Sequence, residues 1–274
     1  MNKQANNWGV MPPQYEQREG EYFDGEKWIC PNCHTPVSQS GERIGTMRCP
    51  CECSQRAAEQ EHEKEKQAAL QKRRVEAFDG NERSIRLGFT FAVDDERNQQ
   101  ATEILRRYCA EFEQRRKKGE GFLIHSPTTG GGKSFLAAAV ANDLIDRGYT
   151  VLVTNFFALG DKLRDPQAYK FVNQHDFIRR LRYYDLIVID DLGANPDTTF
   201  THSIEYRIIE DLTDSQVPLI FTTNATLDEI MRNTDAQKKR IFDRILGKCA
   251  LLHVGQPNGR SRRVEACERL TKGM

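Results

Sequence analysis

Three consecutive glycines followed by a lysine and a serine are the residues of this chain that point most directly to chemistry. In the segment IHSPTTGGGKSFLAAAV, they lie between an apolar run and an alanine-rich stretch. Glycine loses more backbone freedom on folding than other residues, so three in a row favour a place where the backbone itself approaches a ligand. Phosphate suits such a place, because a helix N-terminus offers unpaired N–H groups and the positive end of the helix dipole. The segment therefore predicts a phosphate-binding loop, the alternative being a flexible strand-to-helix turn.

The loop departs at one position from the phosphate-loop pattern G-x-x-x-x-G-K-[ST]. Pro127 stands at the first glycine position, and proline fixes φ near about −65° and has no N–H group. We therefore expect Gly130 and Gly131 to supply the flexibility of the turn. The predicted nucleotide-binding residues are Thr129, Gly130, Gly131, Gly132, Lys133, Ser134, Phe135 and Asp190.

Two carboxylates end the apolar run DLIVIDD. In a parallel sheet, ligands bind at the C-terminal ends of the strands, where Asp190 and Asp191 are expected. Phosphoryl transfer with Mg²⁺ uses a hydroxyl on the metal, which Ser134 can supply, and a carboxylate, which Asp190 can supply. Asp191 would then orient or activate the attacking water. The alternative is an aspartate pair that caps a turn.

A third run, VPLIFTTN, ends in Asn224. A polar side chain at this edge of the sheet could bind the γ-phosphate or the attacking water. Alternatively, Asn224 caps the helix predicted over TLDEIM.

The elements that would position these residues follow from the apolar pattern. From residue 121 onward, short apolar runs alternate with helical stretches, which predicts an α/β domain with a parallel sheet and helices on both faces over residues 80–274. Residues 54–79 are dense in Glu, Lys, Gln, Arg and Ala, which favour a charged helical linker. Residues 1–53 remain as a small N-terminal module.

Five of the eight cysteines lie close together in this module, and they are Cys30, Cys33, Cys49, Cys51 and Cys53. A C-x-x-C knuckle with a second close pair supplies the four soft ligands that tetrahedral zinc takes. Cys30 and Cys33 are the firm members, two of the remaining three complete the set, and His34 is a spare candidate. The predicted site is structural, because so short a segment cannot bury a sufficient core.

Composition limits the other classes of function. Forty Lys and Arg balance forty Asp and Glu, so any nucleic-acid binding must come from local patches. No apolar run approaches the roughly 20 residues that cross a bilayer, which predicts a soluble protein. The N-terminus lacks a signal-peptide pattern, which predicts a cytoplasmic location and favours metal over disulfides.

The run YYDLIVIDDLGANPDTTF, followed by IFTTNATLDEI and KKRIFDRILGKC, resembles the DnaC type of AAA+ ATPases, which are bacterial and phage helicase loaders with the IstB transposition helpers as close relatives. The resemblance covers residues 85–265 and implies an AAA+ fold. It also implies that Lys133 and Ser134 belong to Walker A, that Asp190 and Asp191 form Walker B, and that Asn224 is sensor one.

The tract RIFDRI resembles the arginine-finger segment of this family, with Arg244 as the finger and Arg240 nearby. An arginine that reaches the nucleotide of a neighbouring subunit neutralises charge on the γ-phosphate, which implies ATP-dependent self-assembly. The alternative is a solvated helix face, since the two arginines are spaced i and i+4. GRSRRV resembles the sensor-two region, with Arg262 as first candidate and Arg263 as second. The predicted catalytic residues are Asp191, Asn224, Arg244 and Arg262.

Asp191 stands where many AAA+ proteins carry glutamate, and the shorter carboxylate predicts slow, switch-like ATP hydrolysis. Phe200 and Thr198 lie where loaders of this type present a DNA-facing element, and base stacking on Phe200 would suit single-stranded DNA. Alternatively, Phe200 is an anchor in the core.

The resemblance implies an ATP-dependent helicase loader that binds ATP, Mg²⁺ and single-stranded DNA, assembles into an oligomer, and delivers a replicative DnaB-type helicase to DNA. The N-terminal zinc module would bind the helicase. The first alternative is an IstB-like helper of a transposase that acts on duplex DNA. The others are a monomeric small-molecule kinase and a non-enzymatic adaptor that has lost nucleotide binding.

Overall fold

The computed structural model describes residues 18–41, 45–48, 50–78, 88–93, 98–164, 174–194, 199–232 and 236–255. The chain divides into two compact units, residues 1–69 and 70–274. Within the described ranges, no helix combines the length and the apolar character needed to cross a membrane.

The first unit contains two small antiparallel sheets and most of a long helix. Its elements are β1 (Tyr22–Phe23), β2 (Trp28–Ile29), β3 (Ser38–Gly41), β4 (Gly45–Arg48) and α1 (Glu52–Ala77). Strand β1 pairs with β2, and β3 pairs with β4. The buried residues that pack together in this unit are Trp28, Cys30, Val37 and Cys51. So few apolar side chains cannot offset the entropy of folding, which calls for a covalent or metal cross-link.

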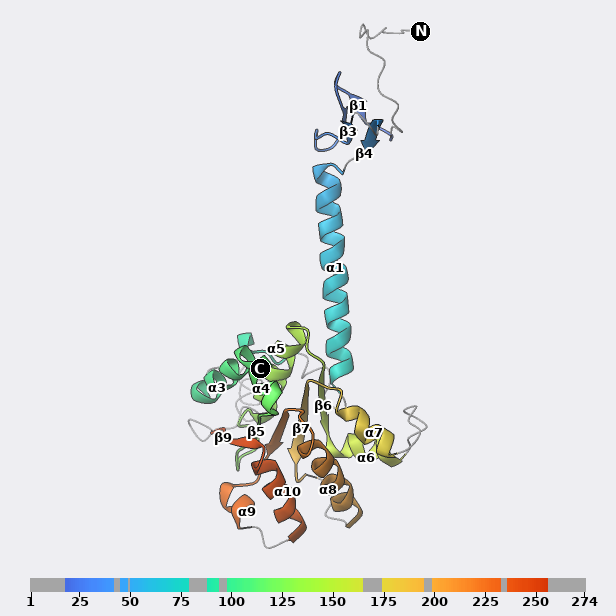
Figure 1. The fold of residues 1–274 in the computed structure, drawn as a ribbon. Helices are drawn as coiled ribbons and strands as arrows, with labels where there is room; N and C mark the ends of the chain where they lie inside the picture. The colour runs from blue at the N-terminus through green and yellow to red at the C-terminus, as the bar shows by residue number, and fades with distance from the viewer. Residues whose placement is uncertain are drawn as a thin grey trace, which may run out of the picture. The chain divides into compact units, whose positions relative to one another are not determined.

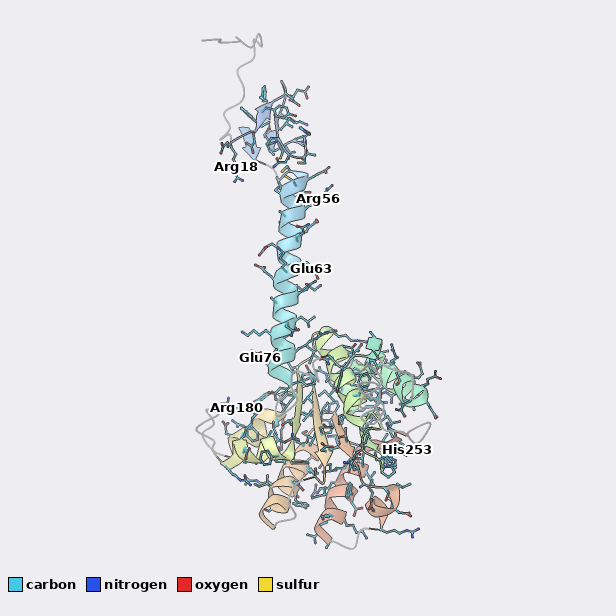
Figure 2. All side chains as sticks on the ribbon, turned by 180° about the vertical axis from the view of Figure 1, so that it is seen from behind. Arg18, Arg56, Glu63, Glu76, Arg180 and His253 are labelled. Atoms are coloured by element: carbon cyan, nitrogen blue, oxygen red, sulfur yellow. The ribbon has the colours of Figure 1, made fainter. Side chains whose placement is uncertain are left out.

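Helix α1 confirms the helix predicted for the charged connector. Charged side chains project from it along its length, as Arg56, Glu63 and Glu76 show in Figure 2, and Ala77 is its buried residue. The C-terminal end of α1 is anchored within the second unit. There, Arg74 makes a bidentate ion pair with Asp146, in which Nη2 lies 2.6 Å from both carboxylate oxygens and Nε lies 3.1 Å from Oδ1. Pairs at i and i+4, such as Lys72 with Glu76, add modest support to a helix that is polar all round.

The second unit contains a five-stranded parallel sheet in the order β6-β7-β8-β5-β9 (Figure 1). The strands are β5 (Gly121–His125), β6 (Val151–Asn155), β7 (Leu186–Leu192), β8 (Leu219–Thr223) and β9 (Cys249–His253). Every neighbouring pair in this sheet is parallel. The predicted α/β fold is therefore confirmed, and β5, β8 and β7 carry the predicted site residues side by side.

Helices cover both faces of this sheet. They are η1 (Phe91–Val93), α3 (Gln99–Ala110), α4 (Phe112–Lys118), α5 (Lys133–Asp146), α6 (Phe156–Arg164), α7 (Gln174–Leu181), α8 (Thr199–Thr213), α9 (Leu227–Met231) and α10 (Ala236–Leu246). Alternate strand residues face opposite clusters, so Ile220 packs with α3 and α5 whereas Leu219 and Phe221 pack with α6, α7, α8 and α10. Burial on both faces explains why the strands are continuous apolar runs.

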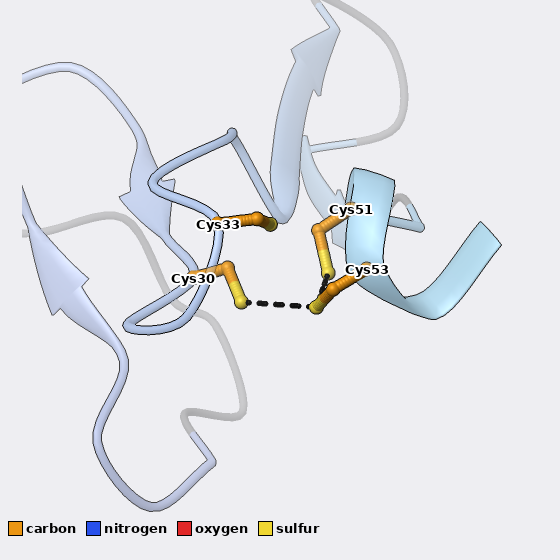
Figure 3. Close-up of side chains that lie close together, drawn as sticks. All are labelled: Cys30, Cys33, Cys51 and Cys53. Carbon is orange, nitrogen blue, oxygen red and sulfur yellow. Dashed lines mark hydrogen bonds between the residues drawn. The ribbon is translucent and has the colours of Figure 1, made fainter. Parts of the chain in front are cut away.

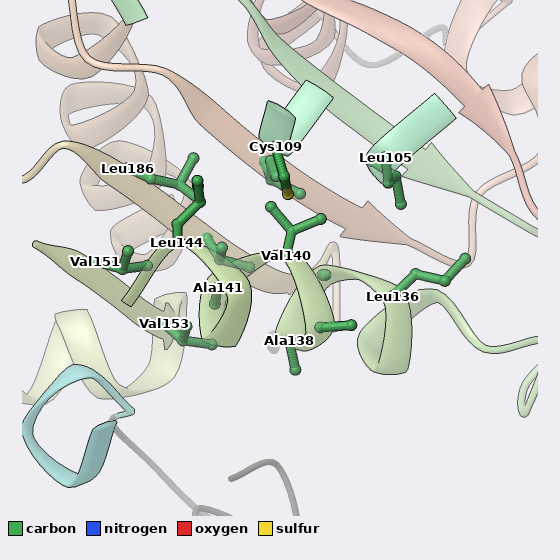
Figure 4. Packing of buried hydrophobic residues seen from close by; sticks show 14 of the residues in the cluster. Leu105, Cys109, Leu136, Ala138, Val140, Ala141, Leu144, Val151, Val153 and Leu186 are labelled. Carbon is green, nitrogen blue, oxygen red and sulfur yellow. The ribbon is translucent and has the colours of Figure 1, made fainter. Parts of the chain in front are cut away.

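Helix α5 is the central helix of one face (Figure 4). Its alanines let it lie close to the sheet, while Leu136, Val140 and Leu144 fill the space between α3 and the strands. These three side chains have no exposed surface. Because a close-packed helix has little freedom to shift, the first turn of α5 holds Lys133 and Ser134 in a defined place beside the strand ends.

Candidate functional site

The predicted phosphate loop spans residues 126–132, between the end of β5 and the start of α5. Gly130 and Gly132 have φ values of 79° and 101°, which glycine adopts without strain. The left-handed positions are thus Gly130 and Gly132, so Gly132 contributes to the turn together with Gly130. A side chain at Gly131 would instead meet Ser126 Oγ at 3.2 Å. The positive φ values therefore favour glycine at positions 130 and 132, and a side chain at position 131 would crowd Ser126.

The turn around Pro127 is closed by its neighbours. Ser126 Oγ lies 3.1 Å from Thr128 Oγ1 and accepts a hydrogen bond from the Thr128 N–H at 3.4 Å. Lys133 is buried, and its ammonium group donates to the carbonyls of Thr128 at 3.0 Å and Ser126 at 3.3 Å. The hydroxyl groups of Ser126 and Thr128 and the ammonium group of Lys133 thus stabilise the turn around Pro127. These contacts do not require a glycine at position 127.

Two further predicted nucleotide-binding residues are Thr129, within the loop, and Phe135, in the first turn of α5. Thr129 is exposed, and Phe135 is half-buried with its ring 5.1 Å from that of Phe89. Asn98, which the sequence analysis did not identify, donates from its amide to the carbonyl of Gly131 at 3.0 Å.

The two carboxylates lie at the C-terminal end of β7. Asp190 is buried, and its Oδ1 accepts hydrogen bonds from Ser134 Oγ at 3.0 Å and from Thr222 Oγ1. Asp191 is exposed and has a φ of 57°, in the left-handed region. The fold thus brings Ser134 and Asp190 together across 56 positions of sequence. A hydroxyl beside a carboxylate at a phosphate loop is the donor set that Mg²⁺ takes in phosphoryl-transfer sites.

Thr222, on the fully buried strand β8, is a second residue that the sequence analysis missed. Its hydroxyl donates to Asp190 and accepts from the Asp191 N–H at 2.9 Å. It therefore holds both residues of the carboxylate pair. A polar pair, Thr222 and Thr223, at the end of an otherwise apolar run was the available signal.

We predict that Thr222→Val lowers the free energy of unfolding of the second unit by about 1–3 kcal/mol, because it leaves buried hydrogen-bonding groups without their partner. Valine has nearly the same shape and suits a strand, so packing changes little. Urea denaturation followed by circular dichroism measures the loss. Thr222→Ser keeps the hydroxyl and serves as control, and equal stability of the valine variant and the wild-type chain would contradict the prediction.

Asn224 follows β8 directly and is exposed at the same edge of the sheet. The alternative role of helix cap is wrong for this residue. Thr226 is the N-cap of α9, and it forms a reciprocal capping box with Glu229. Asn224 therefore remains available to a ligand at the strand ends.

Arg244 lies on α10 and contacts α8 in the same chain. Its guanidinium makes ion pairs with Glu210 at 2.6 Å and Asp214 at 3.2 Å, and lies 5.5 Å from the centre of the Tyr206 ring. Arg240, one turn earlier, is exposed. The two arginines therefore do not form one uniform solvated face.

A histidine pair lies beneath the phosphate loop. His125 ends β5, is buried, and its ring lies 5.0 Å from that of His253 on β9. Burial, with His253 and Lys133 nearby, lowers the pKa of His125. His125 is therefore neutral at pH 7, and Lys133 is the cation of this loop.

The first unit brings four cysteines together (Figure 3). The Sγ atoms of Cys30, Cys33, Cys51 and Cys53 all lie within 4.8 Å of one another. Tetrahedral zinc with Zn–S bonds of about 2.3 Å places its sulfurs about 3.8 Å apart, so the set fits zinc. The Sγ atoms of Cys30 and Cys53 are 3.5 Å apart and those of Cys51 and Cys53 are 3.2 Å apart, longer than a disulfide bond, and all four cysteines are free.

Local contacts shift the pKa values of two of these thiols in opposite directions. A hydrogen bond with Thr35 lowers the pKa of Cys33 to about 5, whereas hydrogen bonds with Cys51 and the other cysteines raise the pKa of Cys53 to about 12. Four thiolates so close together need a cation to be stable together. His34 is exposed, with its Nδ1 3.2 Å from the Tyr22 hydroxyl, and is not part of the cluster.

Several predicted residues lie outside the described part of the chain. They are Cys49, Thr198, Arg262 and Arg263, together with the side chain of Phe200. Their predicted roles stay predictions.

The comparisons with known proteins agree with this geometry. The model of the family described as IstB-like ATP binding protein matches residues 59–267. The replicative helicase loader DnaC of Escherichia coli (strain K12) is 26% identical over 155 residues, which are 57% of this chain and 60% of that protein. The chain thus matches less than two thirds of the length of this relative.

Two further proteins are similar. A putative insertion sequence ATP-binding protein of Sinorhizobium fredii is 40% identical over 92 residues, which are 34% of this chain and 30% of that protein. A crystal structure of DnaI superposes with a TM-score of 0.54 and 21% identity, and covers 69% of this chain and 100% of that structure. This structural likeness supports the fold.

Proposed function

The chain belongs to the IstB-like ATP binding protein family, and we propose that within this family it is an ATP-dependent loader that delivers a replicative DnaB-type helicase to DNA. The relatives include replicative helicase loaders, and the DnaI fold is matched over its full length. The observation that carries ATP binding is the Ser134–Asp190 hydrogen bond beside the glycine loop and Lys133. Residues 1–53 would form the zinc module that binds the helicase, 54–79 the linker, and 80–274 the ATPase domain.

In this proposal the phosphate chain binds to the N–H groups of residues 130–134 at the start of α5. Lys133 exchanges its two carbonyl partners for phosphate oxygens, a better match for an ammonium group. Ser134 and Asp190 would hold Mg²⁺, which would supply positive charge to neutralise the phosphates. Asp191 orients the attacking water and accepts its proton, and Asn224 binds the γ-phosphate or this water.

Arg244 acts in trans in this proposal. To reach a neighbouring subunit's nucleotide, its side chain must leave Glu210 on α8 and Asp214 directly after it. Both ion pairs involve partly exposed side chains, and such pairs contribute roughly 0–1 kcal/mol, so a γ-phosphate competes well for the guanidinium. Arg262 would contact the nucleotide as sensor two, and Phe200 and Thr198 would contact single-stranded DNA.

A transposase helper acting on duplex DNA is the second candidate function, and the 40% identity to the insertion sequence protein favours it. The four-cysteine cluster before the ATPase favours the loader, because it offers a separate module for a protein partner. Mass photometry of the full chain with its host's helicase, with and without ATP, separates the two. The loader predicts a helicase complex that grows with ATP and is lost in Lys133→Ala. No helicase complex, with ATP-dependent assembly on duplex DNA instead, would favour the transposase helper.

Arg240→Ala and Arg244→Ala form a matched pair for the assembly step, since both residues lie on α10 one turn apart. We expect Arg244→Ala to abolish ATP-dependent assembly while Arg240→Ala retains it. The reverse result would transfer the role of the trans cation to Arg240.

A further inference from the structure

Asn98 occupies a helix start without capping it. It is the N-cap residue of α3, and asparagine at this position usually accepts a hydrogen bond from the first turn of the helix. Here its side chain makes no capping bond. Instead, its amide reaches the phosphate loop and donates to the carbonyl of Gly131 at 3.0 Å. A residue that departs from its usual local role points to another function for that side chain.

The target of this hydrogen bond is the centre of the glycine loop. Gly131 lies between two glycines in left-handed conformations, Gly130 and Gly132. Glycines have no side chains with which to fix their own orientation, so the loop depends on contacts from outside. In a trans peptide, the C=O and the following N–H point in opposite directions. A bond that fixes the Gly131 carbonyl therefore also fixes the direction of the Gly132 N–H.

We infer that Asn98 is a positioning residue for the phosphate loop, which holds the Gly131–Gly132 peptide with its N–H directed to the phosphates. The side chain is buried, with 9% of its surface exposed, so water does not readily replace the bond. Because the Gly131 oxygen is an acceptor, Asn98 must present its NH₂ group, and aspartate cannot substitute. This inference rests on the proposed nucleotide binding.

Asn98→Asp separates positioning from a structural role. Aspartate is as good an N-cap as asparagine and suits the positive end of the α3 dipole, which offsets part of the stability lost with the buried hydrogen bond, so the chain should stay folded with a modest change in melting temperature. Its carboxylate would repel the Gly131 carbonyl and release the loop. We expect ATP affinity to fall about tenfold or more, as for loss of a buried hydrogen bond. A merely structural role would instead leave ATP affinity unchanged.

A carboxylate could also repel phosphate directly, so Asn98→Leu is needed as the uncharged variant of similar volume. It should also weaken ATP binding. Tyr108→Phe is the matched control, because it deletes another hydrogen bond from a side chain to a backbone carbonyl, that of Glu120 at 2.9 Å, away from the loop. Isothermal titration with Mg-ATP gives the affinities, and we expect Tyr108→Phe to bind ATP like the wild-type chain.

Hydrogen exchange of residues 126–134 without nucleotide gives an independent measurement. Asn98→Asp and Asn98→Leu should accelerate exchange in this segment, whereas Tyr108→Phe should not. If the wild-type chain binds ATP and both Asn98 variants bind equally well, the positioning inference is overturned and nucleotide binding stands. If the wild-type chain binds no ATP, the proposed function fails, and unchanged exchange in the Asn98 variants would overturn the positioning role as well.

Discussion

Chelation of zinc is expected to unfold the N-terminal module of this chain while the parallel sheet stays folded. The four clustered cysteines replace a core that is too small, and structural zinc sites of this kind contribute about 10–16 kcal/mol of apparent binding energy at pH 7. Helix α1 begins between two of these cysteines, Cys51 and Cys53, so a zinc ion that they hold would also anchor the first turn of the connector. Loss of the metal should therefore release the start of α1.

Tryptophan fluorescence reports on this change selectively. Both tryptophans, Trp8 and Trp28, lie in the first unit, and the second unit has none. Trp28 packs against the cysteine cluster with 8% of its surface exposed, so its emission should shift to longer wavelength on chelation and recover when zinc is returned. Circular dichroism should show that most helix remains.

Substitutions sharpen the zinc prediction. Cys33→Ser should lose stoichiometric zinc, because the described cluster offers exactly the four ligands that tetrahedral zinc takes. Cys49→Ser should retain zinc, and so should Cys109→Ser, which replaces a buried thiol in the other unit. Atomic emission spectroscopy of the purified variants measures the zinc content per chain and so tests these expectations. Retention of one zinc per chain in Cys33→Ser, or its loss in Cys49→Ser, would refute the four-cysteine assignment.

The strands and helices that carry the site were predictable because their signals are local. Continuous apolar runs predict the strands β5, β7 and β8, and the first turn of α5 follows from the glycines. The stretch before β5 forms two helices, α3 and α4, that meet at Glu111. Strand β9 was not predicted, because its sequence CALLH does not alternate between apolar and polar residues. A half-buried strand at the edge of a sheet also carries a weaker hydrophobic pattern than a central strand.

The side-chain contacts within the site were less predictable, because they depend on neighbours in space. The sequence pattern identified Lys133, Ser134 and Asp190, because binding of phosphate and Mg²⁺ requires these types of residue. It missed Asn98 and Thr222, whose roles consist of holding another residue through one hydrogen bond. Neither belongs to a motif, and each becomes visible only when the loop packs on α3 and β8 pairs with β7.

Asp191→Asn is expected to reduce ATP hydrolysis by about 100-fold or more, because an amide cannot accept the proton of the attacking water. The backbone makes this substitution unusually clean. Asp191 has a φ of 57°, which asparagine tolerates as well as aspartate, whereas alanine would add strain. The Asp191 N–H keeps its hydrogen bond to Thr222 in the variant. Binding of ATP should therefore change by no more than about threefold.

Asp190→Asn is the matched control for this carboxylate pair. Asp190 is buried between Ser134 and Thr222, so its neutralisation should weaken Mg²⁺-dependent ATP binding rather than the chemical step alone. Single-turnover hydrolysis with enzyme in excess, together with ATP affinity with and without Mg²⁺, distinguishes the two roles. Hydrolysis by Asp191→Asn at the wild-type rate would show that Asp191 is not the base. Equal losses of ATP affinity in both variants would mean that both carboxylates hold the metal.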